Sequence, residues 1–224
     1  MESTKEFIST NNATIIGTIT SDFRFSHEVF GEKFYEVTVS VKRLSGTLDH
    51  VPVIIPERFS CIKEANPIGR YLKVTGSFRS YNKWSDELQR NRVLLMLFAK
   101  TITFITDSAE MIDANYITLT GTICKAPVFR ITPRKKKVTD LLLAVNRPYS
   151  LSDYIPCICW GHRAKMTAKL PVGSRISLTG FIQSRDYLKR LTEEKTEIRT
   201  AYEISVCSME VLSESEEVRA MEDS

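Results

Sequence analysis

The sequence predicts an all-β protein made of two tandem five-stranded barrels, and two observations lead to this prediction. The chain repeats itself at a constant offset of 104 residues, and apolar residues alternate with polar ones along the repeated segments. The recurring pairs are Gly17 and Gly121, Arg43 and Arg147, Pro52 and Pro156, Gly69 and Gly173, and Gly76 and Gly180. A constant offset requires equal element and loop lengths, so each copy is a whole small domain rather than a solenoid unit.

Composition and charge divide the chain of 224 residues into three parts. Residues 1–108 carry a net charge of +2, residues 109–212 carry +6, and the tail 213–224 carries −4. The basic second domain suggests a polyanionic partner. A polar start, the lack of a long apolar run and an odd number of cysteines predict a cytoplasmic protein.

Each copy shows the two-residue period of half-buried strands. In the first copy we expect strands at 13–20, 34–43, 50–55, 71–81 and 93–104, and in the second at 116–124, 138–146, 153–160, 174–185 and 200–211. A single helix is expected between the third and fourth strands of each copy, at 57–66 and 162–170, ending at Pro-x-Gly. Glycines fall in the middle of strands, where they mark bulges or sharp coiling.

This order of elements is typical of the OB-fold, a five-stranded Greek-key barrel. Another small barrel, such as an SH3-like one, is the alternative. The single helix between the third and fourth strands favours the OB-fold.

The third strand of the second copy, 153–160, places large aromatic residues on one face. Tyr154 and Trp160 share that face with Pro156 and Ile158, while the opposite face holds Ile155, Cys157 and Cys159. The second face is small and apolar and suits a core, and the two cysteines lack the neighbours that a zinc site needs. Tyr154 and Trp160 would then form an aromatic platform for stacked bases, or else cover a partner domain.

Basic and aromatic residues surround this strand and favour base stacking with phosphate neutralisation. The candidates in the second copy are Arg130, Arg134, Lys135, Lys136, Lys137, Arg147, Tyr149, Arg163, Lys165, Arg185 and Tyr187. The first copy has His50 and Pro56 where the second has Tyr154 and Trp160. Its remaining candidates are Arg43, Arg79, Tyr81 and Trp84.

The segments 153–161, 169–173 and 179–187 resemble the bacterial single-stranded DNA-binding protein family. The resemblance implies that Tyr154 and Trp160 occupy the family's two aromatic positions in strand three, and that Arg185 and Tyr187 match the Arg-x-aromatic end of strand four. Tyr149 is a looser match to an aromatic in the loop after strand two. The function implied is sequence-tolerant binding of single-stranded DNA in replication, recombination or repair, within the nucleoid.

The resemblance also implies a working unit of four barrels, which a homodimer of this chain would supply. The tail 213–224 is acidic but short and lacks the family's closing aromatic tip, so recruitment of replication or repair proteins through it is doubtful. No catalytic motif is evident, and we expect neither an enzyme nor a cofactor or metal. The rival function is a protein-interaction module, such as a primosome or mobile-element accessory factor, with weak nucleic-acid binding.

Overall fold

A computed structural model describes residues 10–59, 66–85, 90–149, 151–190 and 196–212, with the backbone alone for 82–85, 90–92 and 189. The first half forms β1 (Asn11–Ile19), β2 (Arg24–Val29), β3 (Glu32–Lys42), β4 (Leu48–Pro56), β5 (Tyr71–Ser85) and β6 (Arg90–Ile105). A 3-10 helix, η2 (Ser108–Glu110), leads to β7 (Ala114–Ile123), β8 (Val128–Ile131), β9 (Lys137–Arg147), β10 (Leu151–Trp160), α1 (Gly161–Thr167), β11 (Arg175–Arg190) and β12 (Thr196–Val211). Among these residues, no helix is long and apolar enough to cross a membrane.

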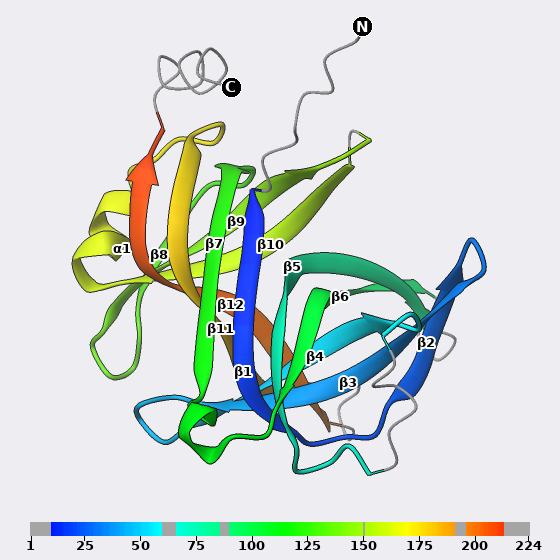
Figure 1. Cartoon of the computed structure of the whole chain (residues 1–224). Helices are drawn as coiled ribbons and strands as arrows, with labels where there is room; N and C mark the ends of the chain where they lie inside the picture. Colours follow the sequence, from blue (N-terminus) through cyan, green and yellow to red (C-terminus); the bar gives the residue numbers. More distant parts are fainter. Residues whose placement is uncertain (1–9, 60–65, 86–89, 150, 191–195, 213–224) are drawn as a thin grey trace, which may run out of the picture.

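Five strands of each half close into a barrel (Figure 1). In the first barrel β1 pairs with β5, β5 with β6, β6 in parallel with β4, β4 with β3, and β3 returns to β1. The second barrel repeats these pairings with β7, β11, β12, β10 and β9. The predicted pair of tandem OB-fold barrels is thereby confirmed.

Three details differ from the sequence prediction. Short strands β2 and β8 pair with β3 and β9 as hairpin arms outside the barrels. All four residues of β8 are exposed, so it lacks the alternation that identifies a strand. The second helix is shorter than predicted; in the first copy, residues 57–59 form a turn and bend instead of a helix, and residues 60–65 lie outside the described residues.

The alternating apolar residues fill the barrel interiors, as in Ile15 and Ile19 of β1 or Leu143 and Val145 of β9, which are fully buried. Gly76 and Gly180 sit at bulges in β5 and β11, where the register with the neighbouring strand shifts. A Cβ on either glycine would collide with a carbonyl oxygen of that neighbour, Phe98 or Ser205. Only glycine therefore allows the tight strand crossing at these two points.

The two barrels join through their first strands, β1 and β7, which pair antiparallel with Ala13 opposite Ile117. These two residues are 104 apart, so the pairing relates the barrels by an approximate twofold axis. All twelve strands form one sheet, whose order reads β2-β3-β4-β6-β5-β1 and then the equivalent strands in reverse. The duplication has thus produced an internal pseudo-dimer.

Equivalent asparagines at the start of β1 and β7 make the same hydrogen bonds within their own barrels, next to the junction. Asn11 donates to the carbonyl of Phe78 at 2.5 Å and accepts its N–H at 2.9 Å. Asn115 does the same with Ile182, at 2.7 and 2.9 Å. Each amide satisfies both backbone groups of one residue and fixes β5 or β11 against the strand that crosses it.

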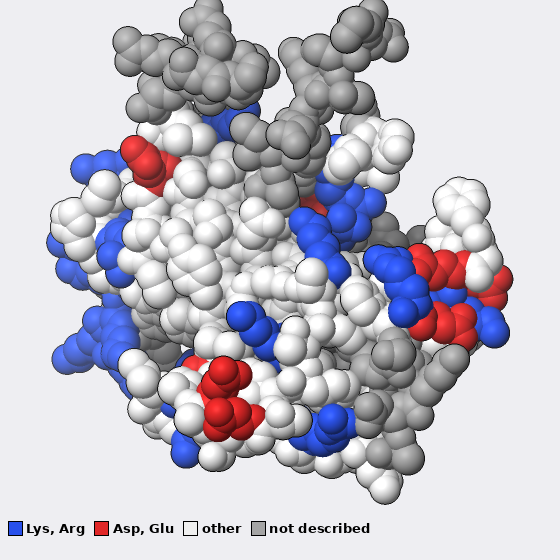
Figure 2. Space-filling view, in the orientation of Figure 1, with Lys and Arg blue, Asp and Glu red and all other residues white. Residues whose placement is uncertain are grey.

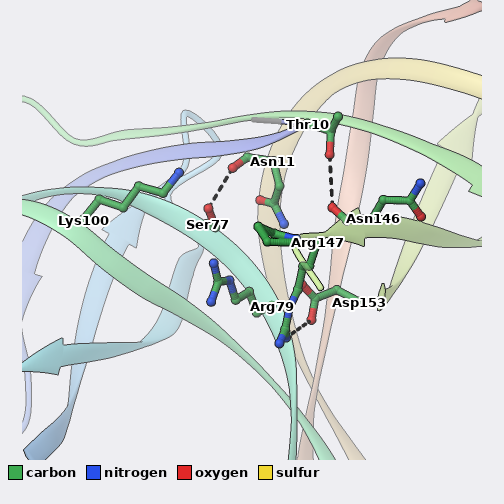
Figure 3. Close-up of a pocket in the computed structure, with 9 residues that line it drawn as sticks. Thr10, Asn11, Ser77, Arg79, Lys100, Asn146, Arg147 and Asp153 are labelled. Carbon is green, nitrogen blue, oxygen red and sulfur yellow. Dashed lines mark hydrogen bonds and ion pairs between the residues drawn. The ribbon is translucent and has the colours of Figure 1, made fainter. Parts of the chain in front are cut away.

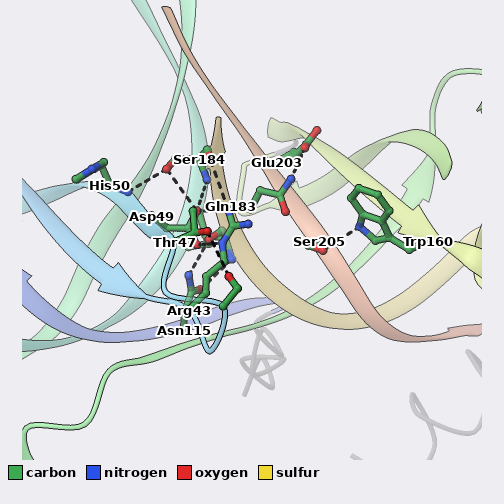
Figure 4. Close-up of polar contacts among 12 residues, drawn as sticks. Arg43, Thr47, Asp49, His50, Asn115, Trp160, Gln183, Ser184, Glu203 and Ser205 are labelled. Carbon is green, nitrogen blue, oxygen red and sulfur yellow. Dashed lines mark hydrogen bonds and ion pairs between the residues drawn. The ribbon is translucent and has the colours of Figure 1, made fainter. Parts of the chain in front are cut away.

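A buried aspartate in each barrel accepts hydrogen bonds from the other barrel, and Figure 4 shows this for Asp49 and Ser184. Asp49 binds Arg43 of its own barrel through both carboxylate oxygens, at 2.5 and 2.6 Å, and accepts the N–H of Ser184 at 2.7 Å. Asp153 accepts from Arg147 at 3.2 Å and from the N–H of Ser80 at 3.0 Å. The two aspartates thus lock the barrels in one relative orientation.

We predict that Arg43→Ala lowers the free energy of unfolding by about 3 kcal/mol, because it leaves the buried Asp49 carboxylate without a counter-charge. The matched control is Arg130→Ala, which removes an Arg–Asp pair of similar geometry at the surface and should cost less than about 1 kcal/mol. Urea unfolding measures both. Equal losses would contradict a structural role for the Arg43–Asp49 pair.

Candidate nucleic-acid interface

The two faces of strand β10 are buried and exposed largely as the sequence predicts. Ile155, Cys157 and Cys159 are buried in the second barrel, whereas Tyr154 on the opposite face is 52% exposed. Ile158 shares the face of Tyr154 but is buried, so this face is covered in the middle and open toward its ends. Tyr154 and Trp160 are six residues apart, which separates them by about 20 Å along the strand.

Trp160 ends β10 and forms a wall of a pocket of about 280 Å³, which we call the tryptophan pocket. Its other walls come from the loop between β8 and β9, namely Thr132, Pro133, Arg134 and Lys136. The indole Nε1 donates to Ser205 Oγ at 3.1 Å, which fixes the ring while part of its surface stays exposed (Figure 4). A held aromatic ring beside two cations is the arrangement that accepts a base and its phosphates.

The loop of the tryptophan pocket is held by its own hydrogen bonds. Thr132 N–H donates to the carbonyl of Lys136 at 2.8 Å, and the Thr132 hydroxyl accepts the N–H of Lys136 at 3.1 Å. Lys135 takes a left-handed conformation at the tip, with φ of 59°. The backbone of the loop is therefore ordered, while its cationic side chains point outward and are exposed.

Two lysines stand close together beside this loop. Lys137 begins β9 and Lys165 lies on α1, and the contact between their ammonium groups lowers the pKa of Lys137. Like charges held together in this way are relieved by an anion between them. Figure 2 shows the Lys and Arg side chains gathered over α1 and the β8–β9 hairpin.

The remaining predicted residues of the second barrel lie farther along its surface. Arg130 is paired with Asp140 at 2.6 Å, and Arg163 is exposed on α1. Arg185 and Tyr187 are exposed on the part of β11 that extends beyond the barrel. Tyr149 is 95% exposed in the β9–β10 loop with a φ of 64°, a conformation that is uncommon for a bulky residue.

The structure places three predicted arginines at the junction of the barrels rather than beside the aromatic platform. Arg43 and Arg147 are held by the buried aspartates, and Arg43 also lies over the ring of Phe181, at 5.6 Å from its centre. Arg79 lies over the ring of Phe98 at 5.5 Å. The guanidinium groups of Arg43 and Arg147 are thus engaged in ion pairs at the junction, and their predicted role in nucleic-acid binding stays a prediction.

In the first barrel, aromatic rings stack on one another. His27 of the β2 arm lies between Phe34 and Tyr81, with ring centres 4.9 and 5.0 Å away. These contacts use a face of Tyr81 that a base would need. His50, the equivalent of Tyr154, donates its backbone N–H to Ser184 Oγ across the junction, and the side chain of Trp84 lies outside the described residues.

Sequence analysis missed the polar residues of the junction and also Lys100, which lies with Arg79 beside the junction. The signal was present in the repeat: Asn11 and Asn115, Asp49 and Asp153, and Ser80 and Ser184 all obey the offset of 104. The offset alone does not say which copies contact each other. The β11–β12 hairpin is three residues longer than the β5–β6 hairpin, so the offset between the copies is 107 in the last strand. The counterpart of Lys100 is therefore Cys207.

Thiol reactivity tests the orientation of β10. Burial raises the pKa of Cys159 to about 11, so at pH 8 only about one thiol in a thousand is ionised, and reactivity rises as the pH approaches that value. We expect iodoacetamide to label the exposed Cys207 in the native protein, but Cys157 and Cys159 only after unfolding in guanidinium, as read by mass spectrometry. Labelling of Cys159 as fast as Cys207 would show that Cys159 faces solvent and would contradict the assigned buried face of β10.

Comparison with known proteins finds sequence similarity to the family that the sequence analysis suggested. Residues 114–212 match the model of the single-strand binding protein family. The single-stranded DNA-binding protein of Halalkalibacterium halodurans is 36% identical over 80 residues, which cover 33% of this chain and 48% of that protein. Single-stranded DNA-binding protein 3 of Listeria innocua is 35% identical over 80 residues, or 33% and 50% of the two chains. This chain therefore spans about half the length of these relatives.

Among solved structures, the wild-type single-stranded DNA binding protein from Thermus aquaticus matches with a TM-score of 0.69 and 18% identity. The match covers 91% of this chain and 93% of that one, so both barrels take part in it. At this identity the likeness concerns the fold. The second barrel is therefore similar in sequence to the single-strand binding protein family, and the whole chain shares the fold of the Thermus aquaticus protein.

Proposed function

We propose that this chain binds single-stranded DNA without sequence preference, and that the second barrel is the main binding surface. The observation that carries the proposal is the tryptophan pocket, where Trp160 is fixed by Ser205 next to Arg134 and Lys136. The names of the family and of the relatives support it. Family membership also favours a binding protein over an enzyme.

The chemistry of the pocket accounts for both tolerance and strand selectivity. Every base has an aromatic face, so stacking on Trp160 and Tyr154 would add about 1–3 kcal/mol per base without reading its edge. Arg134, Lys136 and the Lys137–Lys165 pair would neutralise phosphates. A duplex keeps its bases stacked on each other and would contact only the cations.

We assign residues 1–108 and 109–212 to the two domains, and residues 213–224 to an acidic tail. The first domain supports the second through the shared junction, and its stacked aromatic rings make it the weaker binder. A protein that binds single-stranded DNA would act on exposed single strands in the nucleoid, during replication, recombination or repair.

We expect Tyr154→Ala and Trp160→Ala each to weaken binding of oligo-dT by about 1–3 kcal/mol, because each removes a stacking surface. His50→Ala is the matched control at the equivalent site of the first barrel and should change little. Fluorescence anisotropy with a labelled oligonucleotide, and with its duplex as a second ligand, measures these effects. Equal small effects of all three substitutions, or equal affinity of the native protein for duplex and single strand, would refute the proposed function.

Charge reversal in the basic loop tests the phosphate contacts. In single-strand binding, log Kobs falls with log salt by about 0.7 per neutralised phosphate. Arg134→Glu and Lys136→Glu should each reduce that slope by about this amount, whereas Lys73→Glu, on an exposed position of β5, should leave it unchanged. A slope that the loop variants share with the native protein would show that the loop makes no phosphate contact.

We also propose that two chains form a homodimer with four barrels. The β1 and β7 edges already pair within the chain, so a dimer would use another surface. Phe25, Phe30 and Leu44 of the first barrel are exposed apolar side chains that would suit such a contact. Light scattering at micromolar concentration should give twice the mass of one chain; a mass of one chain, independent of concentration, would rule out the dimer.

A further inference from the structure

A second pocket lies at the junction of the barrels, away from the walls of the tryptophan pocket (Figure 3). We call it the junction pocket. It has a volume of about 230 Å³ and is lined by residues of both barrels, among them Arg79 and Lys100 of the first and Arg147 and Asp153 of the second. One water occupies about 30 Å³ of liquid, so a hydrated phosphate group fits within this volume.

The walls of the junction pocket carry an excess of positive charge. Of the nine residues that line it, Arg79, Lys100 and Arg147 are cationic and Asp153 alone is acidic. Asp153 Oδ1 accepts from both the N–H and the hydroxyl of Ser80, at 3.0 and 3.1 Å, while its buried Oδ2 has no hydrogen-bond partner among the described residues. The pocket thus holds three cations against one carboxylate. Figure 2 shows Lys and Arg side chains gathered between the β9–β10 hairpin and β5.

Arg147 differs from its counterpart Arg43 in how it binds its aspartate. Arg43 donates to both carboxylate oxygens of Asp49, at 2.5 and 2.6 Å, whereas Arg147 donates only to Oδ1 of Asp153, through Nη1 at 3.2 Å. A guanidinium has five N–H donors, and the pairing of Arg147 with Asp153 uses fewer of them than the Arg43–Asp49 pair does.

The cations of the junction pocket also raise each other's electrostatic free energy. Burial and the nearby Arg147 lower the pKa of Arg79. Burial and the nearby Arg79 lower the pKa of Lys100. Both shifts mean that the positive charges are partly desolvated and repel one another, which is the condition that a bound anion relieves.

The equivalent position on the other side of the pseudo-twofold axis shows that the barrel scaffold does not require these cations. There Arg79 is replaced by Gln183, whose amide donates to Glu203 at 2.7 Å, and Lys100 by Cys207. The small Ser77 is replaced by Phe181, whose ring lies under Arg43. One side of the axis is therefore filled and the other is open and basic.

We propose that the junction pocket binds a phosphate group through Arg79, Lys100 and Arg147. Arg147 and Pro148 of the pocket wall lead directly into the exposed Tyr149 of the β9–β10 loop, whereas Tyr154 in β10 projects from the face opposite that of Asp153. A backbone phosphate of a strand that leaves the second barrel would enter it, which rests on the proposed function. A free phosphate compound is the other source of the same chemistry.

Three variants test the site: Arg79→Gln, which installs the residue type of the equivalent position, Lys100→Gln, and the two together. Lys73→Gln, at an exposed position of β5 outside the pocket, is the control for charge. Affinity for oligo-dT is measured over a range of salt concentrations. Inorganic phosphate is titrated at constant ionic strength and followed by calorimetry, and thermal unfolding without phosphate checks that each variant folds.

We expect the double variant to bind oligo-dT roughly tenfold more weakly than Lys73→Gln, with a salt slope smaller by about 0.7. Phosphate binding that disappears with unchanged DNA affinity would identify a free phosphate compound as the source. Oligo-dT and phosphate binding equal to those of Lys73→Gln would overturn the site. Failure of the native protein to bind oligo-dT would refute the proposed function instead, and the phosphate titration would then decide the site alone.

Discussion

The antiparallel pairing of β1 with β7 is the interaction on which the rest of the structure depends. It places the two barrels about a twofold axis at Ala13 and Ile117, and it brings Asp49 and Asp153 under backbone N–H groups of the opposite barrel. A buried carboxylate is costly when it loses its ion-pair and hydrogen-bond partners, so these contacts tolerate little displacement. The relative position of the barrels, and of any surface that spans them, is thereby fixed.

Within this symmetric frame the two copies have different surfaces. The second barrel has a fixed tryptophan beside a basic loop, whereas in the first barrel His27 fills the space between Phe34 and Tyr81. The junction differs in the same manner, with Arg79 and Lys100 on one side and Gln183 and Cys207 on the other. Duplication preserved the residues that hold the barrels together and allowed the exposed residues to diverge.

Much of the fold could be predicted because strand period and repeat offset are local properties of the sequence. The faces of β10 followed from alternation alone, as the burial of Ile155 and the exposure of Tyr154 show. The β2 and β8 arms could not be predicted, since neither strand alternates between buried and exposed residues. The role of Arg43 and Arg147 was also out of reach, because their position depends on how two domains pack, and a single sequence does not reveal which surfaces meet.

The central claim is that Trp160 stacks on a base of the bound strand. The chain has two tryptophans, so the Trp84→Phe variant leaves Trp160 as the sole source of indole emission. Titration of this variant with unlabelled oligo-dT should quench its fluorescence to saturation, because a stacked base quenches indole emission. Unchanged emission in that variant while anisotropy shows bound DNA would contradict the account and move the binding surface away from the second barrel's tryptophan pocket.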